Sequence, residues 1–411
     1  MAATCCSFTQ SSSGFRKLHE NIQLQSYFTR QVVPSSLYQQ RSTCSVENIF
    51  HRDYGGRFLQ VEGWHQHQYL LCARGVELSP SANEEVGEET EEDISKETLI
   101  WRAIKLPIYS VAFVPLTVGS AAVYFQTGIF SARCYFVLLA SSVLAITWLN
   151  LSNDVYDFDT GVDKNKKESV VNLAGSRKGT FIAAYLCLAI GFLGLTWTAV
   201  VERNIRSILF LVCAIICGYI YQCPPFRLSY QGLGEPLCFA AFGPFATCAF
   251  YLLHGSSSVM NHFPLSGTVL SASILVGFTT SLILFCSHFH QVEGDKEVGK
   301  MSPLVRLGTK KGAEVVKGAV FMLYALLVAF GLIKALPLTC IFLCALTLPM
   351  GNLVVRFVED NYKAIVFSQN KNKIFMAKYF CVRLHALFGV ALALGLVLAR
   401  NTKFTSWPIL S

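Results

Sequence analysis

The sequence predicts an all-α fold, a polytopic transmembrane helical bundle with about nine transmembrane helices. The chain of 411 residues is 53% hydrophobic but only 15% charged, whereas soluble domains are usually about a quarter charged. Its apolar residues lie in long runs of about 20 residues, which is the length that crosses a bilayer as a helix. Repeated apolar runs of this kind indicate helices, because a spanning chain must satisfy its backbone polar groups internally.

The predicted spans are bounded by polar loops or by glycine and proline. They cover 103–126, 133–155, 180–201, 206–222, 236–254, 267–290, 315–334, 338–357 and 380–400. The loops after the even-numbered spans carry most of the lysines and arginines near the membrane, so those loops share the cytoplasm-equivalent side. This topology explains the net charge of +8 without a nucleic-acid partner. Most of the 15 cysteines lie inside apolar runs, and we interpret them as packing residues.

The residues before the first span divide into two segments. Residues 1–72 are rich in Ser, Gln and Arg and poor in acids, without a long apolar stretch, as in an organelle transit peptide. Their serine content favours the chloroplast, and an ordinary disordered tail is the alternative. Residues 73–100 are acidic and predict a solvated, disordered linker. Residues 101–411 then form the transmembrane domain, with its basic side facing the stroma.

A first polar motif follows the second span. Its side chains are Asn150, Asn153, Asp154, Asp157, Asp159 and Asp163. The first four are spaced to share one helical face, and the last two are expected in the loop. Charged groups at membrane depth cost at least ~2.5–3.5 kcal/mol each, so a cation must offset these acids. Mg²⁺ suits clustered hard oxygen ligands that leave room for phosphate oxygens. A solvated helix end is the alternative.

A second polar motif follows the sixth span. It contains His288, Gln291, Glu293, Asp295, Lys300 and Arg306. The spacing of His288, Gln291 and Asp295 predicts one helical face, with Asp295 as the best second metal ligand. Lys300 and Arg306 are candidates to hold phosphate oxygens. The two histidines of this segment have no third soft ligand nearby in the sequence, so we favour hydrogen-bonding roles over zinc.

A third motif lies between the fourth and fifth spans, on the same predicted side. Tyr221 precedes Pro224–Pro225, which end the helix, and Arg227 is the only cation of this loop. Arg227 is a candidate clamp for a diphosphate, with a topological anchor as the alternative. Bridging Mg²⁺ would let carboxylates bind an anionic diphosphate and stabilise its departure. The apolar bundle would then accommodate a long hydrocarbon chain.

These motifs resemble those of the UbiA superfamily of intramembrane prenyltransferases, over about residues 101–400. The Asn153-Asp154-Val-Tyr-Asp157 motif, an acidic motif after the sixth span and nine spans carry the resemblance. Gly299-Lys300 and Leu304–Gly308 are similar to the MenA branch, and Phe289–Glu293 and Pro224–Arg227 to its plant and cyanobacterial form. Bacterial relatives commonly carry an Asp at the position of Gln291, which leaves Glu293 or Gln291 as the alternative ligand here.

The resemblance implies Mg²⁺-dependent transfer of phytyl from phytyl diphosphate to 1,4-dihydroxy-2-naphthoate, with loss of CO₂, in phylloquinone synthesis. The implied catalytic residues are Asn153, Asp154, Asp157, Asp163 and Asp295. The implied metal ligands are Asp154, Asp157, Asp163, Glu293 and Asp295. The implied substrate-binding residues are Asn150, Tyr221, Arg227, His288, Gln291, Lys300 and Arg306. Two alternatives stay open: a related enzyme acting on homogentisate or chlorophyllide, and a secondary transporter. A non-catalytic scaffold would leave the acidic motifs unexplained.

Overall fold

The structure is a computed structural model that describes residues 103, 105–161, 169–255, 265–362, 374 and 376–401. All of them belong to one compact unit, Glu88–Ser411. The transit peptide and the acidic linker lie outside the described residues and stay predictions, as does the position of Asp163. Within the described residues the regular structure is helical, without strands, which confirms the all-α prediction.

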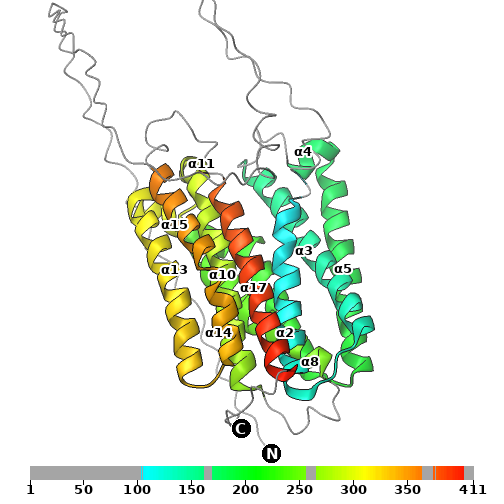
Figure 1. Ribbon diagram of the computed structural model, residues 1–411. Coiled ribbons are helices and arrows are strands. Elements are labelled where there is room, and N and C mark those ends of the chain that lie inside the picture. The colour runs from blue at the N-terminus through cyan, green and yellow to red at the C-terminus, as the bar shows by residue number, and fades with distance from the viewer. Residues whose placement is uncertain are drawn as a thin grey trace, which may run out of the picture. The chain divides into compact units, whose positions relative to one another are not determined.

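The helices stand side by side in one bundle (Figure 1). Their bounds are η1 Leu106–Tyr109, α2 Ser110–Thr127, α3 Ala132–Thr160, α4 Val170–Ala174, α5 Arg177–Val201, α6 Arg206–Gln222, η2 Leu228–Gln231, α7 Gly234–Ala240, η3 Ala241–Thr247, α8 Cys248–His254, α10 Gly267–Ser287, η4 His288–His290, α11 Val292–Glu297, α12 Pro303–Leu307, α13 Thr309–Leu332, α14 Leu338–Ala345, α15 Leu348–Asn361 and α17 Ala377–Asn401. The last helix, α17, packs beside the first long one, α2.

All nine predicted apolar segments are helical, but they do not all qualify as spans. In the described part of the chain, seven helices are long and apolar enough to cross a membrane. The pair α14 and α15 makes an eighth if it is one span, although it bends by 43°. Helix α6 matches the predicted fourth segment, but with only 17 residues it is shorter than the seven candidate spans and is not counted among them. The exact count of nine therefore stays a prediction.

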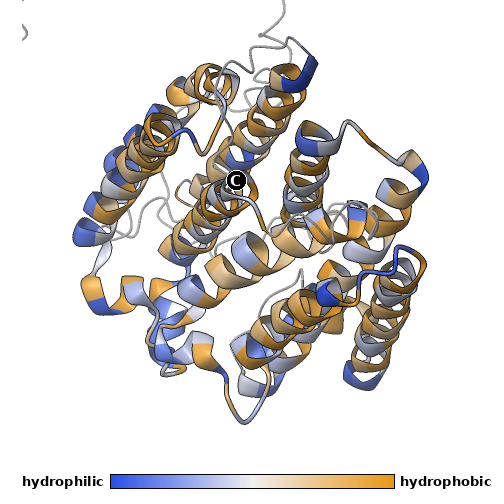
Figure 2. Cartoon of the chain, turned by 90° about the horizontal axis from the view of Figure 1, so that it is seen from below, coloured by the Kyte–Doolittle hydropathy of each residue, from blue (hydrophilic) through white to orange (hydrophobic). Residues whose placement is uncertain are grey.

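The outer surface of the bundle is apolar, as lipid contact requires. Large apolar side chains such as Phe321, Leu332 and Leu346 are more than 70% exposed. Viewed along the helices, the cartoon is mainly orange, with blue patches concentrated toward helix ends and connections (Figure 2). Because lipid solvates apolar side chains, this exposure does not carry the penalty it would have in water.

Capping residues define where the helices begin and end. Ser131, Ser176 and Ser266 each accept a backbone hydrogen bond at the start of a long helix, which satisfies one of its free N–H groups. Helix α3 ends at Gly161, whose φ of 84° lies in the left-handed region that glycine tolerates. Helix α3 therefore continues five residues past the predicted end of its span, to Thr160.

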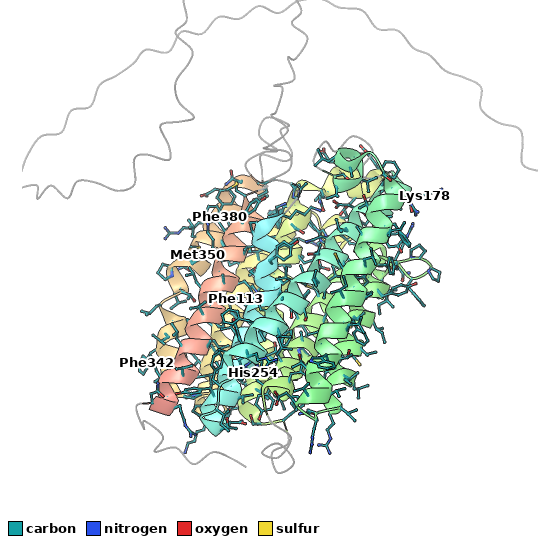
Figure 3. All side chains as sticks on the ribbon, turned by 90° about the vertical axis from the view of Figure 1, so that its right-hand side faces the viewer. Phe113, Lys178, His254, Phe342, Met350 and Phe380 are labelled. Atoms are coloured by element: carbon teal, nitrogen blue, oxygen red, sulfur yellow. The ribbon has the colours of Figure 1, made fainter. Side chains whose placement is uncertain are left out.

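The ends of the second and sixth spans lie at the same end of the bundle. Helix α4 follows α3, helix α11 follows α10, and both short helices lie at the top of Figure 1. Figure 3 shows the same two ends of the bundle, with Lys178 and Phe380 toward one end and His254 and Phe342 toward the other. The predicted meeting of the first two motifs at one membrane face is therefore possible.

The fifth span packs against the sixth through glycines. A Cβ atom on Gly243 would lie 2.7 Å from the carbonyl oxygen of Ser273 and 2.8 Å from the Cα of Gly277. Both of these atoms belong to the backbone of α10, so a rotamer change cannot relieve the clash. The close approach resembles the small-residue contacts that let membrane helices pack tightly.

We expect Gly243→Leu to destabilise the bundle, because its side chain has to enter the backbone of α10. Overpacking of this kind costs about 1–3 kcal/mol, which lowers the melting temperature of the detergent-solubilised protein by several degrees. Gly318→Leu is the matched control, because a Cβ atom there meets nothing within 4 Å. Equal melting temperatures for the two variants would contradict the proposed packing.

Candidate functional site

The first motif occupies the last turns of α3. Asn150, Asn153, Asp154 and Asp157 are all helical, as predicted from their spacing. Asn153 Nδ2 donates a hydrogen bond to Asp157 Oδ2 over 2.8 Å, which fixes the carboxylate against its own helix. The prediction that Asp159 lies in the loop is wrong, because α3 continues through it to Thr160.

Asp154 is the deepest carboxylate of this motif, with 1% of its side chain exposed. Its Oδ1 accepts a hydrogen bond from the ammonium of Lys105 at 2.6 Å. Its Oδ2 accepts one from the backbone N–H of Val170 at 3.1 Å. Both oxygens are therefore occupied, as a buried charge requires. Lys105 is not among the residues predicted from the sequence, because a lysine at the start of the predicted first span, 103–126, resembles an ordinary topological anchor.

Asp159 connects two long helices instead of facing the other acids. Arg177, the first residue of α5, holds it in a two-pronged ion pair of 3.0 and 2.6 Å. Such bidentate pairs are geometrically specific. The pair holds the ends of α3 and α5 together, and this junction positions α4, whose Val170 contacts Asp154.

The second motif breaks its helix, contrary to the single helical face predicted for it. Helix α10 ends at Ser287, a 3₁₀ turn follows, and Gln291 with φ −106° separates that turn from α11. His288, Gln291 and Asp295 therefore do not lie on one continuous α-helix, although the backbone of Gln291 stays in the right-handed helical region and its carbonyl accepts a hydrogen bond from the Asp295 N–H.

Asp295 is the buried acid of the second motif, with 2% of its side chain exposed. Lys300 Nζ lies 3.3 Å from its Oδ1, while its buried Oδ2 has no hydrogen-bond partner among the described residues. A buried carboxylate oxygen without a partner is costly, so this atom is a ready position for a cation. Glu293, by contrast, is exposed.

The third motif connects the first two. The hydroxyl of Tyr230 lies 3.0 Å from Thr160 Oγ1 and 3.4 Å from Asp157 Oδ1, at the end of α3. Its carbonyl oxygen accepts a hydrogen bond from the Met301 N–H, within the second motif. The Lys300 ammonium lies 5.7 Å from the centre of its ring. Tyr230 therefore joins all three segments.

Burial and then the charge of Asp157 raise the pKa of Tyr230 to about 12. Its phenol consequently stays protonated near neutral pH, and it can serve as a hydrogen-bond donor to the Asp157 carboxylate. Tyr230 is not among the residues predicted from the sequence to have a role. A tyrosine in a loop a few residues after Pro225 gives no sequence signal of a bridging function.

Two further contacts complete the polar end of the bundle. His288 Nδ1 lies 3.1 Å from Glu235 Oε1, at the start of α7, and the buried Glu235 Oε2 has no hydrogen-bond partner among the described residues. Tyr221, at the end of α6, lies within electrostatic range of Glu235, Asp157 and Asp295. The carboxylates of both acidic motifs therefore act electrostatically on Tyr221. Sequence analysis assigned Glu235 no function.

The cations of the site differ in how they are engaged. Arg227, with φ 42°, has a buried Nε without a hydrogen-bond partner in the described part of the chain, and its guanidinium carbon lies 5.9 Å from the Tyr230 ring. Arg306 donates to the backbone carbonyls of Gln231 and Met301 over 2.7 and 3.1 Å. Arg306 thus connects the second motif to the third. This structural role was not predicted, because the sequence suggested only a phosphate contact for Arg306.

The residues present fit a hard divalent cation that is shared with a substrate. Asp157, Asp295 and Glu235 all act electrostatically on Tyr221, and the buried Asp295 Oδ2 and Glu235 Oε2 have no hydrogen-bond partner among the described residues. Over the described ranges, no three His, Cys, Asp or Glu side chains form a preformed metal site. Mg²⁺ usually takes only one or two carboxylates and completes its coordination with water and substrate phosphates. The arrangement suits that mode.

This chain is similar in sequence to two phytyltransferases over most of its length. The chain is 68% identical over 310 residues to the chloroplastic 2-carboxy-1,4-naphthoquinone phytyltransferase of Arabidopsis thaliana, covering 75% of this chain and 80% of that protein. It is 40% identical over 293 residues to the 2-carboxy-1,4-naphthoquinone phytyltransferase of Synechocystis, covering 71% of this chain and 91% of the relative.

A solved structure of a UbiA homolog from Archaeoglobus fulgidus bound to GPP and Mg²⁺ aligns with 72% of this chain and 99% of that chain, at 16% identity and a TM-score of 0.46. The model of the UbiA prenyltransferase family matches residues 112–379, which is more than half of the chain. The chain is therefore a member of the UbiA prenyltransferase family.

Proposed function

We propose that this enzyme transfers a phytyl group from phytyl diphosphate to 1,4-dihydroxy-2-naphthoate, a step of phylloquinone (vitamin K1) biosynthesis. The observation that carries the proposal is the convergence of three polar segments on Tyr230, at one end of an apolar bundle. The two phytyltransferase relatives supply the phytyl donor and the naphthalene acceptor. The end-of-bundle position gives a charged diphosphate access to water and its chain access to apolar surface.

The carboxylates of the two acidic motifs serve as metal ligands in this proposal. Asp157 and Asp295 are the main pair, because the Tyr230 hydroxyl contacts Asp157 while Lys300 contacts both Asp295 and the ring of Tyr230. Asp154 joins them from one turn earlier on α3, and Asp163 stays a candidate from sequence alone. Bound Mg²⁺ would supply positive charge that neutralises the diphosphate as its C–O bond breaks. Asn153 holds Asp157 in place through its 2.8 Å hydrogen bond.

Two cations assist the departing diphosphate. Arg227 has an unpartnered buried N–H, a donor suited to a phosphate oxygen. Lys300 lies between Asp295 and the ring of Tyr230, so its ammonium borders both the metal ligands and the third motif. Charge develops on the diphosphate in the transition state, and fixed cations are most effective there. Asn150, His288 and Gln291 remain proposed substrate contacts.

The acceptor supplies the nucleophile. A ring carbon of the dihydroxynaphthoate attacks the allylic carbon of the donor, and the C–O bond electrons leave with diphosphate. Attack at the carbon that bears the carboxylate lets the electrons of the C–CO₂ bond restore aromaticity as CO₂ leaves. No ring proton is then removed, so this route needs no general base. The product is a phytyl naphthoquinol, which a separate two-electron oxidant converts to 2-phytyl-1,4-naphthoquinone.

The oxidation state of the acceptor is a specific point of the proposal. Both relatives are named for 2-carboxy-1,4-naphthoquinone, which has the same carbon skeleton as 1,4-dihydroxy-2-naphthoate but two electrons fewer. A quinone ring is electron-poor and a poor nucleophile toward an allylic cation. We therefore propose that the reduced, dihydroxy form is the species that reacts.

The proposed location is a chloroplast membrane, with the polar end facing the stroma. The chloroplastic relative and the seven membrane-length helices support the first part, and the lysine-rich loops support the second. A secondary transporter fits less well, because transporters place their charged sites near the midplane, whereas these carboxylates gather at one end of the helices.

An acceptor panel tests the reaction. We expect purified protein with labelled phytyl diphosphate to prenylate 1,4-dihydroxy-2-naphthoate and to be inactive with homogentisate, with chlorophyllide and with the oxidised 2-carboxy-1,4-naphthoquinone. Chromatography of labelled products is the measurement, and EDTA should abolish the signal until Mg²⁺ is restored. Prenylation of homogentisate or chlorophyllide, without a naphthoquinol product, would replace the proposed acceptor.

Removal of one carboxylate tests the metal ligands. We expect Asp157→Asn and Asp295→Asn each to lower kcat by about 10²–10³-fold, the usual cost of removing one group that stabilises developing charge. The helical circular dichroism should be retained. Glu359→Gln is the control, because Glu359 forms an exposed ion pair with Lys317 and belongs to none of the three polar motifs. Wild-type turnover by either Asp variant would remove that residue from the site.

The bridging function of Tyr230 is tested by Tyr230→Phe, which keeps the ring and removes the hydroxyl. We expect kcat to fall roughly tenfold, because a hydrogen bond to a charged group is worth about 1.5–3 kcal/mol and this one is long. Tyr124→Phe should leave kcat unchanged, because the Tyr124 hydroxyl donates to Asn401, outside the three polar motifs. A kcat equal to that of the wild type would mean that the hydroxyl does not position Asp157.

A further inference from the structure

The ion pair between Lys105 and Asp154 raises a conflict within the proposed site. Asp154 is almost fully buried, and the Lys105 ammonium contacts its Oδ1 at 2.6 Å. The second oxygen is occupied by the Val170 N–H. A divalent cation bound to Asp154 Oδ1 would lie beside the Lys105 ammonium, which already donates to that oxygen at 2.6 Å, and the two positive charges would repel each other. Metal binding at Asp154 therefore favours departure of Lys105.

The second acidic motif offers an internal comparison. Asp295 also has a lysine partner, but Lys300 lies 3.3 Å away on one oxygen and the other oxygen is buried without a partner in the described residues. A cation can therefore approach Asp295 without displacing a protein group. Asp295 can therefore bind a cation as it stands, whereas Asp154 has to exchange its lysine partner for the metal.

Lys105 has the freedom that an exchange requires. Its side chain is 24% exposed, whereas that of Asp154 is 1% exposed, so the lysine reaches inward from the rim. It precedes the short helix η1 and has a left-handed backbone, with φ 50° and ψ 40°. A non-glycine residue in that region carries backbone strain.

The charge balance favours exchange as well. Without a metal, Lys105 neutralises a buried carboxylate that would otherwise be unpaired. With a divalent cation and a diphosphate present, the carboxylate is neutralised by the metal and new negative charge appears beside it. The ammonium, on its flexible four-carbon stem, can then bind phosphate oxygens as a point charge.

We propose that Lys105 is an exchangeable counter-ion. It occupies Asp154 in the metal-free enzyme, leaves it when a divalent cation binds, and then contacts the diphosphate of the donor. This inference rests on the proposed function, because it assumes that Asp154 serves a metal and that the donor is a diphosphate. It adds Lys105 to the residues that bind the donor, beyond the three polar motifs.

Amine labelling of the full-length wild-type protein in detergent tests the exchange directly. Lys105 is labelled with an N-hydroxysuccinimide ester, and peptide mass spectrometry gives its rate. We expect slow labelling in EDTA, faster labelling with Mn²⁺ alone, and slow labelling again with Mn²⁺ and inorganic diphosphate. Lys317 is the internal reference, because its exposed pair with Glu359 lies outside the site. A rate that is the same in all three states would overturn the proposal.

Binding measurements on variants give a second test. We expect Lys105→Met to bind Mn²⁺ about tenfold more tightly than wild type. The variant lacks the ammonium that competes with the metal for Asp154, and loss of one charged hydrogen bond changes an affinity by about that factor. Its affinity for inorganic diphosphate in saturating Mn²⁺ should fall about tenfold for the same reason. Lys105→Arg should retain diphosphate affinity, and Lys317→Met should change neither quantity. Calorimetry measures both affinities.

The outcomes separate this inference from the proposed function. A folded Lys105→Met protein with unchanged or weaker Mn²⁺ affinity would overturn the exchange while leaving the enzyme's reaction intact. Absence of Mn²⁺ binding by the wild type even in the presence of inorganic diphosphate would overturn the metal-dependent function itself. If Lys105→Met does not fold, the labelling pattern of the wild type decides the question.

Discussion

Neutralisation of buried carboxylates at the edge of the membrane is the constraint on which the rest of this structure depends. Asp154 and Asp295 are each nearly inaccessible, and each has a lysine within ion-pair distance. Ionised groups at such depth are tolerated only when paired. This requirement brings the start of η1 to the end of α3, and the segment after α11 back onto α11.

The same requirement explains the path of the chain between the long helices. Tyr230 reaches the end of α3 through its hydroxyl and the segment after α11 through its carbonyl, and Arg306 binds the carbonyl of the neighbouring Gln231. The loop of the third motif therefore closes the polar end of the bundle. An apolar bundle needs such a closure, because helix packing in lipid supplies no hydrophobic force that would draw the loops together.

The pairing pattern also connects stability to function. Carboxylates that are held by lysines form a site that is stable without a metal, yet lysines bind weakly enough to exchange their partners. Asp159 shows the contrast, because its bidentate pair with Arg177 is directional and structural. Exchangeable partners suit a site whose charge changes during the reaction, and fixed partners suit the junction between α3 and α5.

The sequence by itself determined the all-α bundle, the apolar segments and the helical face of the first motif. These features depend on local hydrophobicity and on the period of one helix, which a linear pattern contains. The family resemblance supplied the reaction class in the same way, through short contiguous motifs. Only the tertiary structure showed the break at Gln291, the bridge made by Tyr230 and the pairing of Lys105 with Asp154. The bridge and the ion pair join residues that lie tens of positions apart, and their partners are selected by burial and charge balance in three dimensions.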